Sequence, residues 1–174
     1  MIFVTVGHQM AFDRLIRLVD EWAGRSRVRD IFAQIGETDY RPKHMPFAQF
    51  MSRTEFAAQL ERCSRVVAHA GVGTIIQTLE KQKPLLVLPR RSAFGETRSD
   101  HQVGTARHFA DRGLIMAAFS DDELLALLDR HQAFKPSAGL GRNASPQLLA
   151  RIRSFLTEQA DEPTVAPLPP LAGD

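Results

Sequence analysis

Cysteine is almost absent from this 174-residue sequence, which contains only Cys63. One cysteine cannot form a disulfide within the chain, so the composition favours a reducing compartment. Cys63 lies at the end of a predicted helix with no evident base nearby. We therefore expect a small buried apolar residue rather than a nucleophile.

Long apolar runs are also absent. No stretch approaches the roughly 18 residues of a membrane span. The apolar start at residues 2–6 is too short for a signal peptide. The sequence therefore predicts a soluble, cytoplasmic protein.

The chain has little surplus charge of either sign. A formal net charge of +2 gives no support to a nucleic-acid partner. Hydrophobic residues make up 44% and charged residues 24%, a balance typical of soluble globular proteins. The length accommodates one ordinary domain and is too short for a two-domain nucleotide-sugar or dinucleotide enzyme.

Several motifs of catalysis and ligand binding are missing. Without Gly-Lys-Ser/Thr there is no P-loop, and without Gly-x-Ser-x-Gly there is no hydrolase elbow. The absence of Asp-x-Asp argues against a divalent ion that holds a diphosphate. The six histidines are scattered, and His101 and His108 have no acidic partner one turn away. We expect no metal and no cofactor.

The most informative stretch is residues 65–89, RVVAHAGVGTIIQTLEKQKPLLVLP. It reads as strand, glycine turn, helix and strand, which predicts a crossover in a parallel sheet. The turn at residues 69–74 combines two glycines with a helix N-terminus, a combination that suits a phosphate. The glycines alone also fit a purely structural turn. A dinucleotide fingerprint is not matched, because Ile76 occupies its third glycine position.

Strand and helix patterns alternate along the rest of the chain. The predicted strands are at residues 1–6, 30–35, 46–51, 66–67, 85–88 and 114–116. Helices are predicted from residue 12 to a stop at Gly24, after the capping boxes Ser52/Glu55 and Ser120/Glu123, across residues 103–110 up to Gly113, and at residues 146–156. This order predicts an α/β fold, a single Rossmann-like three-layer domain with a mostly parallel sheet over residues 1–158. A disordered proline-rich tail is expected at residues 159–174.

Three loops should lie at the carboxyl edge of this sheet, where ligands of such folds bind. They are residues 7–9, 69–74 and 90–102. The chemistry that their side chains favour is a diphosphate held by backbone N–H groups and hydroxyls, with neutral side chains contacting a sugar.

A resemblance to a known family rests on ordered motifs across residues 2–155. The patterns His69-Ala70-Gly71-x-Gly73-Thr74, Lys83-Pro84-Leu85-x-Val87-x-Pro89 and Asp100-His101-Gln102 resemble the nucleotide-sugar-binding half of GT-B glycosyltransferases. They are similar to the family-28 C-terminal domain found in the peptidoglycan lipid II N-acetylglucosaminyltransferase. The opening Phe3-Val4-Thr5-Val6-Gly7 with Phe12-Asp13-x-Leu15-Ile16 is similar to the stand-alone catalytic subunit of the dolichol-linked chitobiose-forming transferase. The pairs Arg90-Arg91 and Gly95-Glu96 are more like the small subunits of bacterial exopolysaccharide glucuronosyltransferases.

The resemblance implies roles for particular residues. The diphosphate would lie at the turn, and the sugar hydroxyls or a phosphate oxygen would contact His101 and Gln102. An ordinary helix start capped by Asp100 is the alternative for that second segment. Gln77 occupies a position where the family often has a glutamate that binds the ribose, with Glu80 one turn further on. The implied nucleotide-sugar contacts are His69, Gly71, Val72, Gly73, Thr74, Gln77, Arg90, Arg91, Asp100, His101 and Gln102.

Three arginines and one histidine suggest hypotheses about the donor sugar and the catalytic base. Arg90, Arg91 and Arg98 follow a strand toward the same edge, and paired arginine donors suit the carboxylate of a uronic acid. Phosphate contacts or a solvated loop are the alternatives. His8 follows the first strand and is a candidate catalytic base, or else it lines the cleft or a subunit boundary.

The function implied is the donor-binding catalytic subunit of an inverting, metal-independent UDP-sugar glycosyltransferase. It would transfer glucuronic acid or another hexose to a lipid-linked saccharide in exopolysaccharide synthesis. A membrane-associated subunit would bind the acceptor, dock on the helix at residues 146–156 and recruit this chain to the inner face of the membrane. The alternatives are a nucleotide-sugar-binding regulatory module without turnover and a UDP-sugar epimerase.

Overall fold

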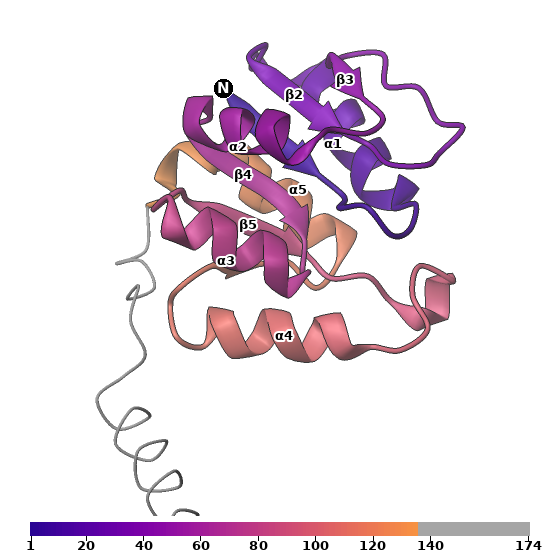
Figure 1. Cartoon of the computed structure of the whole chain (residues 1–174), viewed down its shortest axis with the longest axis vertical. Coiled ribbons are helices and arrows are strands. Elements are labelled where there is room, and N and C mark those ends of the chain that lie inside the picture. Colours follow the sequence, from indigo (N-terminus) through magenta and orange to yellow (C-terminus); the bar gives the residue numbers. More distant parts are fainter. Residues whose placement is uncertain (136–174) are drawn as a thin grey trace, which may run out of the picture. The chain divides into compact units, whose positions relative to one another are not determined.

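A parallel sheet of six strands forms the centre of the computed structural model, which describes residues 1–135. The strands are β1 (Ile2–Thr5), β2 (Ile31–Gln34), β3 (Phe47–Ala48), β4 (Arg65–His69), β5 (Leu85–Leu88) and β6 (Met116–Ala117). The helices are α1 (Asp13–Arg25), α2 (Arg53–Arg62), α3 (Val72–Glu80), α4 (His101–Ala110) and α5 (Asp121–Asp129). Short 3₁₀ turns lie at Ser92–Phe94 and His131–Ala133. Figure 1 shows the helices on the two faces of the sheet, which confirms the predicted three layers.

The strand order β3-β2-β1-β4-β5-β6 explains where a ligand can bind. From β1 the chain proceeds outward to β2 and β3, and it then returns to β4 on the other side of β1. Residues Ile2–Thr5 therefore pair with residues 31–34 on one side and with residues 65–68 on the other. Because neighbouring loops diverge at such a switch point, a crevice opens at the carboxyl ends of β1 and β4.

Alternate side chains of the strands build a separate core on each face of the sheet. Val4 of β1 packs in the cluster beneath α1 and α5. Phe3 packs on the opposite face, in the cluster beneath α2, α3 and α4. Leu15 of α1 and Ile75 of α3 are fully buried examples from the two faces. Burial of a side chain of this size contributes about 1.5–3 kcal/mol, so these two layers fix the strands whose ends carry the loops.

The helix α1 differs from the prediction, because Gly24 lies inside it rather than after it. A Cβ at this position would lie 2.8 Å from the His44 ring. Gly24 therefore allows the segment that contains His44 to approach the helix.

The third strand is shorter than predicted, with two residues. The carbonyls of Pro46 and Ala48 still accept from the N–H groups of Ala33 and Ile35, at 3.0 Å each. The segment thus runs along β2 for about the predicted length without forming a long strand.

The last strand begins two residues later than predicted. The N–H of Leu114 donates to the carbonyl of Phe109, and Gly113 has a φ of +65°, so these residues close the end of α4.

One of the two predicted capping boxes is complete. Ser52 accepts from the N–H of Glu55 at the start of α2, and the Glu55 carboxylate accepts from the N–H of Ser52. At α5 the Ser120 hydroxyl accepts from the N–H of Glu123, but the Glu123 carboxylate accepts from the N–H of Phe119 instead.

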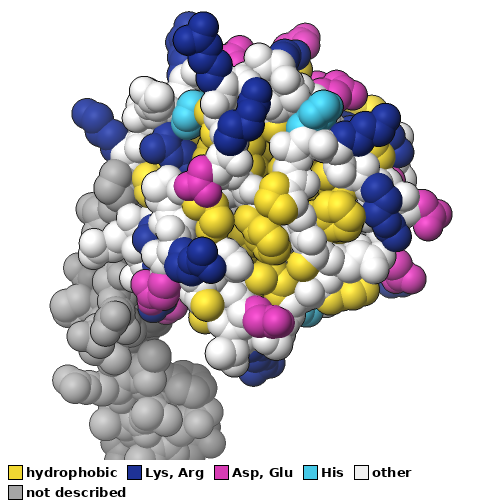
Figure 2. Space-filling view, turned by 90° about the horizontal axis from the view of Figure 1, so that it is seen from above, with side chains coloured by type: hydrophobic (Ala, Val, Ile, Leu, Met, Phe, Trp, Pro, Cys, Tyr) yellow, Lys and Arg dark blue, Asp and Glu magenta, His cyan; other side chains and the backbone are white. Residues whose placement is uncertain are grey.

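The surface seen in Figure 2 has apolar side chains gathered over its middle and charged side chains around them. Within residues 1–135, no helix has the length and apolar character required to cross a membrane. The helix predicted at residues 146–156 and the tail predicted at residues 159–174 lie outside the described residues.

Candidate functional site

Two adjoining cavities occupy the crevice at the carboxyl ends of β1 and β4. The first has a volume of about 430 Å³ and the second about 320 Å³. Both are lined by Gly7, His8, Gly73 and Thr74, so they meet where the loop after β1 faces the start of α3. Gln34, Met51, Ser52, Arg53, Phe56 and Gln77 complete the first cavity, whereas Val6, Gln9, Met10, His69, Gly71, Arg90, Thr97, His101 and Gln102 complete the second.

The start of α3 lies at the junction of the two cavities. Gly71 is its N-cap and makes no side-chain cap hydrogen bond, which leaves N–H groups of the first turn to other acceptors. A Cβ at Gly73 would contact nothing within 4 Å, so the space over this turn is open. The Thr74 hydroxyl follows at the next position. The open N–H groups and the hydroxyl suit an anion.

His69 is wedged between the two glycine loops. A Cβ at Gly7 would lie 2.7 Å from the imidazole and one at Gly71 would lie 2.2 Å from it, so both positions require glycine. Gly7 also has a φ of +77°. Burial, together with the nearby Arg90 charge, lowers the pKa of His69 to about 4. The neutral ring therefore supports the floor of the second cavity.

The Arg90 guanidinium forms hydrogen bonds within the protein. Its side chain is almost fully buried, and its Nη2 donates to the carbonyls of Val6 at 2.8 Å and Met10 at 2.6 Å. Its Nη1 donates to the carbonyls of Ala11 and Glu96. Burial lowers its pKa to about 10 against the opposing attraction of Glu96. The guanidinium thus holds the loop after β1 in place, and its main-chain contacts leave little capacity for a substrate carboxylate.

Glu96 organises the neighbouring loop in a similar way. Its carboxylate accepts from Nε and Nη2 of Arg14 at 2.6 and 2.9 Å, and from the N–H of Arg91 at 2.8 Å. The Arg91 side chain donates to the carbonyl of Phe119 and lines neither cavity. Arg98 is exposed and also lies outside both linings.

The three residues of segment 100–102 make different contacts. The Gln102 oxygen accepts from the N–H groups of Ala70 and Arg90, each at 3.2 Å, and so ties the ends of β4 and β5 together. His101 is exposed and lines the second cavity. Asp100 accepts from the N–H and hydroxyl of Ser92 instead of capping α4 through its side chain.

The structure therefore brings most of the predicted site residues together. Three of them line neither cavity: Val72, which is exposed on α3, Arg91 and Asp100. The predicted residues that line one or both cavities are His8, His69, Gly71, Gly73, Thr74, Gln77, Arg90, His101 and Gln102.

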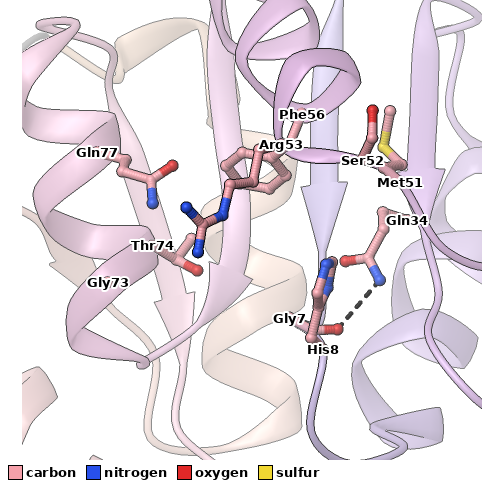
Figure 3. A pocket seen from close by; sticks show the side chains of 10 residues that line it. All are labelled: Gly7, His8, Gln34, Met51, Ser52, Arg53, Phe56, Gly73, Thr74 and Gln77. Carbon is pink, nitrogen blue, oxygen red and sulfur yellow. Dashed lines mark hydrogen bonds between the residues drawn. The ribbon is translucent and has the colours of Figure 1, made fainter.

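Several lining residues lie outside the predicted site, and Gln34, Arg53 and Phe56 are the polar and aromatic ones of most interest. The amide of Gln34 donates to the carbonyl of Gly7 at 3.0 Å, which Figure 3 shows, and its oxygen accepts from the Thr5 hydroxyl at 2.6 Å. Arg53 and Phe56 enter the first cavity from the start of α2. The capping box at residues 52–55 was the available signal, because it marks a helix that begins at this edge of the sheet.

The side chains that line the two cavities carry no negative charge, which suits an anionic ligand. Neither lining contains Asp or Glu. Among residues 1–135, no group of three His, Cys, Asp or Glu side chains is arranged to hold a metal ion. Backbone N–H groups, hydroxyls, amides, imidazoles, the Arg53 guanidinium and one apolar wall at Met51 and Phe56 remain as the contacts for a ligand.

Comparison with known proteins gives partial sequence matches. The chain is 29% identical over 83 residues to the UDP-N-acetylglucosamine--N-acetylmuramyl-(pentapeptide) pyrophosphoryl-undecaprenol N-acetylglucosamine transferase of Prochlorococcus marinus, which is 45% of this chain and 22% of that enzyme. It is 37% identical over 81 residues to the UDP-N-acetylglucosamine transferase subunit ALG13 of Eremothecium gossypii, which is 43% of this chain and 38% of that subunit. The matches thus span well under half of these curated relatives.

Solved structures support the fold. The NMR structure of ALG13 has a TM-score of 0.54 at 18% identity, over 87% of this chain and 93% of that one. The calicheamicin glycosyltransferase CalG4 has a TM-score of 0.54 at 14% identity, over 74% of this chain and 34% of that one. The parallel α/β domain is therefore that of the C-terminal half of GT-B glycosyltransferases.

A family model, the glycosyltransferase family 28 C-terminal domain, matches residues 1–152. This range contains the entire sheet and both cavities. The chain therefore belongs to the glycosyltransferase family 28 C-terminal-domain family.

Proposed function

We propose that this chain is the donor-binding subunit of an inverting glycosyltransferase that uses a UDP-sugar and needs no metal ion. The observation that carries the proposal is the meeting of two carboxylate-free cavities at the start of α3, within a family-28 domain. The curated relatives are named for the use of UDP-N-acetylglucosamine, which supports a UDP-sugar as the donor.

The two linings favour one orientation of the donor. The first cavity offers Phe56 and Met51 to a flat base and Gln77 to the ribose. The second offers the polar side chains of His101 and Thr97 to the sugar. The diphosphate then lies at the shared residues 73 and 74, against the N–H groups of α3.

The donor sugar is proposed to be glucuronic acid or another hexose. Arg90 and Arg91 are engaged with main-chain carbonyls, so they no longer support recognition of a carboxylate. The support for glucuronate is therefore the sequence resemblance alone. Turnover with UDP-glucose and none with UDP-glucuronate would remove it.

The transfer itself needs a base. The acceptor oxygen bonds to C1 of the sugar as the bond from C1 to the diphosphate breaks, and the electron pair stays on UDP. The proton of the acceptor hydroxyl passes to a base. His8 lines both cavities and is the candidate in this chain. Normal turnover of H8A in the assembled enzyme would exclude this role.

A second subunit is proposed to bind a lipid-linked acceptor at the membrane and to recruit this chain to its inner face. The fold is that of the C-terminal half of GT-B glycosyltransferases, and the match covers only 34% of CalG4, so a second domain is expected to complete the cleft. Val72 and Ile76 are exposed apolar side chains on α3, the helix that borders both cavities, and such surfaces favour a protein contact. Exopolysaccharide synthesis as the setting rests on the sequence resemblance.

The test begins with calorimetric titration of UDP into the full chain, followed by transfer assays with and without a co-purified membrane subunit. UDP binding by the chain alone, with transfer only after reconstitution, is the expected result. The absence of UDP binding would overturn the proposal. Binding without transfer in either preparation would indicate a regulatory module, and interconversion of UDP-sugars without an acceptor would indicate an epimerase.

A further inference from the structure

Arg53 is a cation held at the mouth of the first cavity by the geometry of α2. It is the first residue of that helix, directly after the N-cap Ser52. The capping box fixes the helix start, with the Glu55 carboxylate 2.7 Å from the Ser52 nitrogen. Figure 3 shows the Arg53 guanidinium extending from α2 across the cavity toward Thr74, opposite Gln77.

Three other arginines around the crevice, Arg14, Arg90 and Arg91, are engaged within the protein, and exposed Arg98 lines neither cavity. Arg14 bonds to Glu96, Asp121 and the carbonyl of Pro89, whereas Arg90 and Arg91 donate to main-chain carbonyls. Arg53, in contrast, makes no hydrogen bond or ion pair with another residue in the described part of the chain. Its donors are free for a ligand.

The charge of Arg53 also lacks a local counterion. The nearest acid along α2, Glu55, uses its carboxylate at the N–H of Ser52. No Asp or Glu lines the cavity that the guanidinium enters. An unpaired cation opposite the open first turn of α3 favours an anion between them.

We propose that Arg53 binds the diphosphate of the donor from the side opposite α3. This inference rests on the proposed function and adds the residue that supplies positive charge to the nucleotide. The planar guanidinium can donate two parallel N–H bonds to phosphate oxygens. It therefore places a positive charge where the departing UDP gains negative charge during transfer.

Phe56 makes the arrangement selective for a nucleotide over a free phosphate. It lies three residues after Arg53, on the same face of α2, and lines the same cavity. Its ring packs against Phe3 with centroids 5.4 Å apart, which fixes its orientation. One helix thus offers an aromatic surface to a base and a guanidinium to the phosphates that follow it.

The test is calorimetric titration of UDP and of uridine into the full chain and three variants. R53A should bind UDP at least about tenfold more weakly. R53K should be intermediate, because an ammonium keeps the charge and loses the paired geometry. R62A is the matched control, since Arg62 lies exposed in the last turn of the same helix and lines neither cavity.

The pattern across ligands separates the possible outcomes. Uridine has no phosphate, so its affinity should be the same for R53A and the wild type. Equal UDP affinity of R53A and wild type would overturn the inference and leave the proposed function in place. An equal loss of UDP and uridine affinity would also overturn it, because it would indicate a damaged cavity. Failure of the wild type to bind UDP would overturn both proposals.

Discussion

His69 shows how one side chain determines the shape of both glycine loops. Its ring occupies the space that a Cβ at Gly7 or Gly71 would need. Its Nδ1 is buried without a hydrogen-bond partner among the described residues. Protonation would place a charge in this position beside the buried Arg90 guanidinium. The folded protein therefore prefers the neutral ring.

This preference predicts a pH-dependent stability. The pKa of His69 is about 4 in the folded state and about 6.5 in an unfolded chain. The unfolded state thus binds more protons between these values, and the free energy of unfolding should fall by of order 3 kcal/mol as pH drops from 6.5 to 4. Urea denaturation of wild type and H69N at intervals of pH measures the difference, and H69N should lack this loss.

Two comparisons test whether the loss of stability between pH 6.5 and 4 comes from His69. H108N changes an exposed histidine and should keep the wild-type dependence on pH. Asp20 also stabilises the fold in a pH-dependent way, because hydrogen bonds from the N–H of Lys43, the Tyr40 hydroxyl and the N–H of His44 outweigh burial and lower its pKa below 3.8. Its contribution is lost only at lower pH. An identical slope for H69N and wild type between pH 6.5 and 4 would contradict the prediction.

At the scale of elements, the loops that border the second cavity are held by charged side chains from distant positions. Arg14 of α1 binds Glu96, which lies between β5 and α4, and the two side chains are only 15% and 10% exposed. Arg90 binds the loop between β1 and α1 from the same region. The two loops are thus fastened to each other.

Removal of one partner should therefore cost more than loss of a surface ion pair. We expect E96A to lower the free energy of unfolding by about 2 kcal/mol, because Arg14 and the N–H of Arg91 lose their acceptor. E61A removes the exposed pair with Lys81, which water screens, and should change stability much less than E96A does. Denaturant unfolding of both variants provides the measurement, and equal effects would show that the Glu96 network is no stronger than a surface pair.

The elements were predictable from sequence because their signals are local. Ser52 and Glu55 are three residues apart, and the strand at residues 85–88 is a continuous apolar run. The site was predictable to the level of its three loops, since parallel strands place their carboxyl ends at one edge.

The long-range contacts were not predictable in this way. Arg90 reaches the carbonyl of Val6 across 84 positions of the chain, and no local pattern distinguishes such a contact from an arginine that faces a ligand. Arg53 was missed for the converse reason, because the cavity that it enters is formed by α3 and the loop after β1. Only the packed structure shows that Arg90 is hydrogen-bonded within the protein and that Arg53 is free to bind a ligand.

At the scale of the whole molecule, a bound donor should stabilise the fold through mass action. Ligand at about 100 times its dissociation constant adds about 2.7 kcal/mol to the free energy of unfolding. For a domain of this size we expect UDP to raise Tm by about 5 to 10 °C. Differential scanning calorimetry with UDP measures the shift. Uridine at the same concentration is the control and should shift Tm less, so an equal shift with uridine would exclude a phosphate contribution.

The position of β1 has a consequence for how the chain is made. β1 is a central strand, and its partner β4 begins only at Arg65, about sixty residues further along the chain. At about 5–20 residues per second, roughly 3 to 12 seconds separate the synthesis of β1 from the start of β4. During this time the apolar run at residues 2–6 has an unpaired edge. Until β4 is made, this edge of β1 can therefore pair with a strand of another chain.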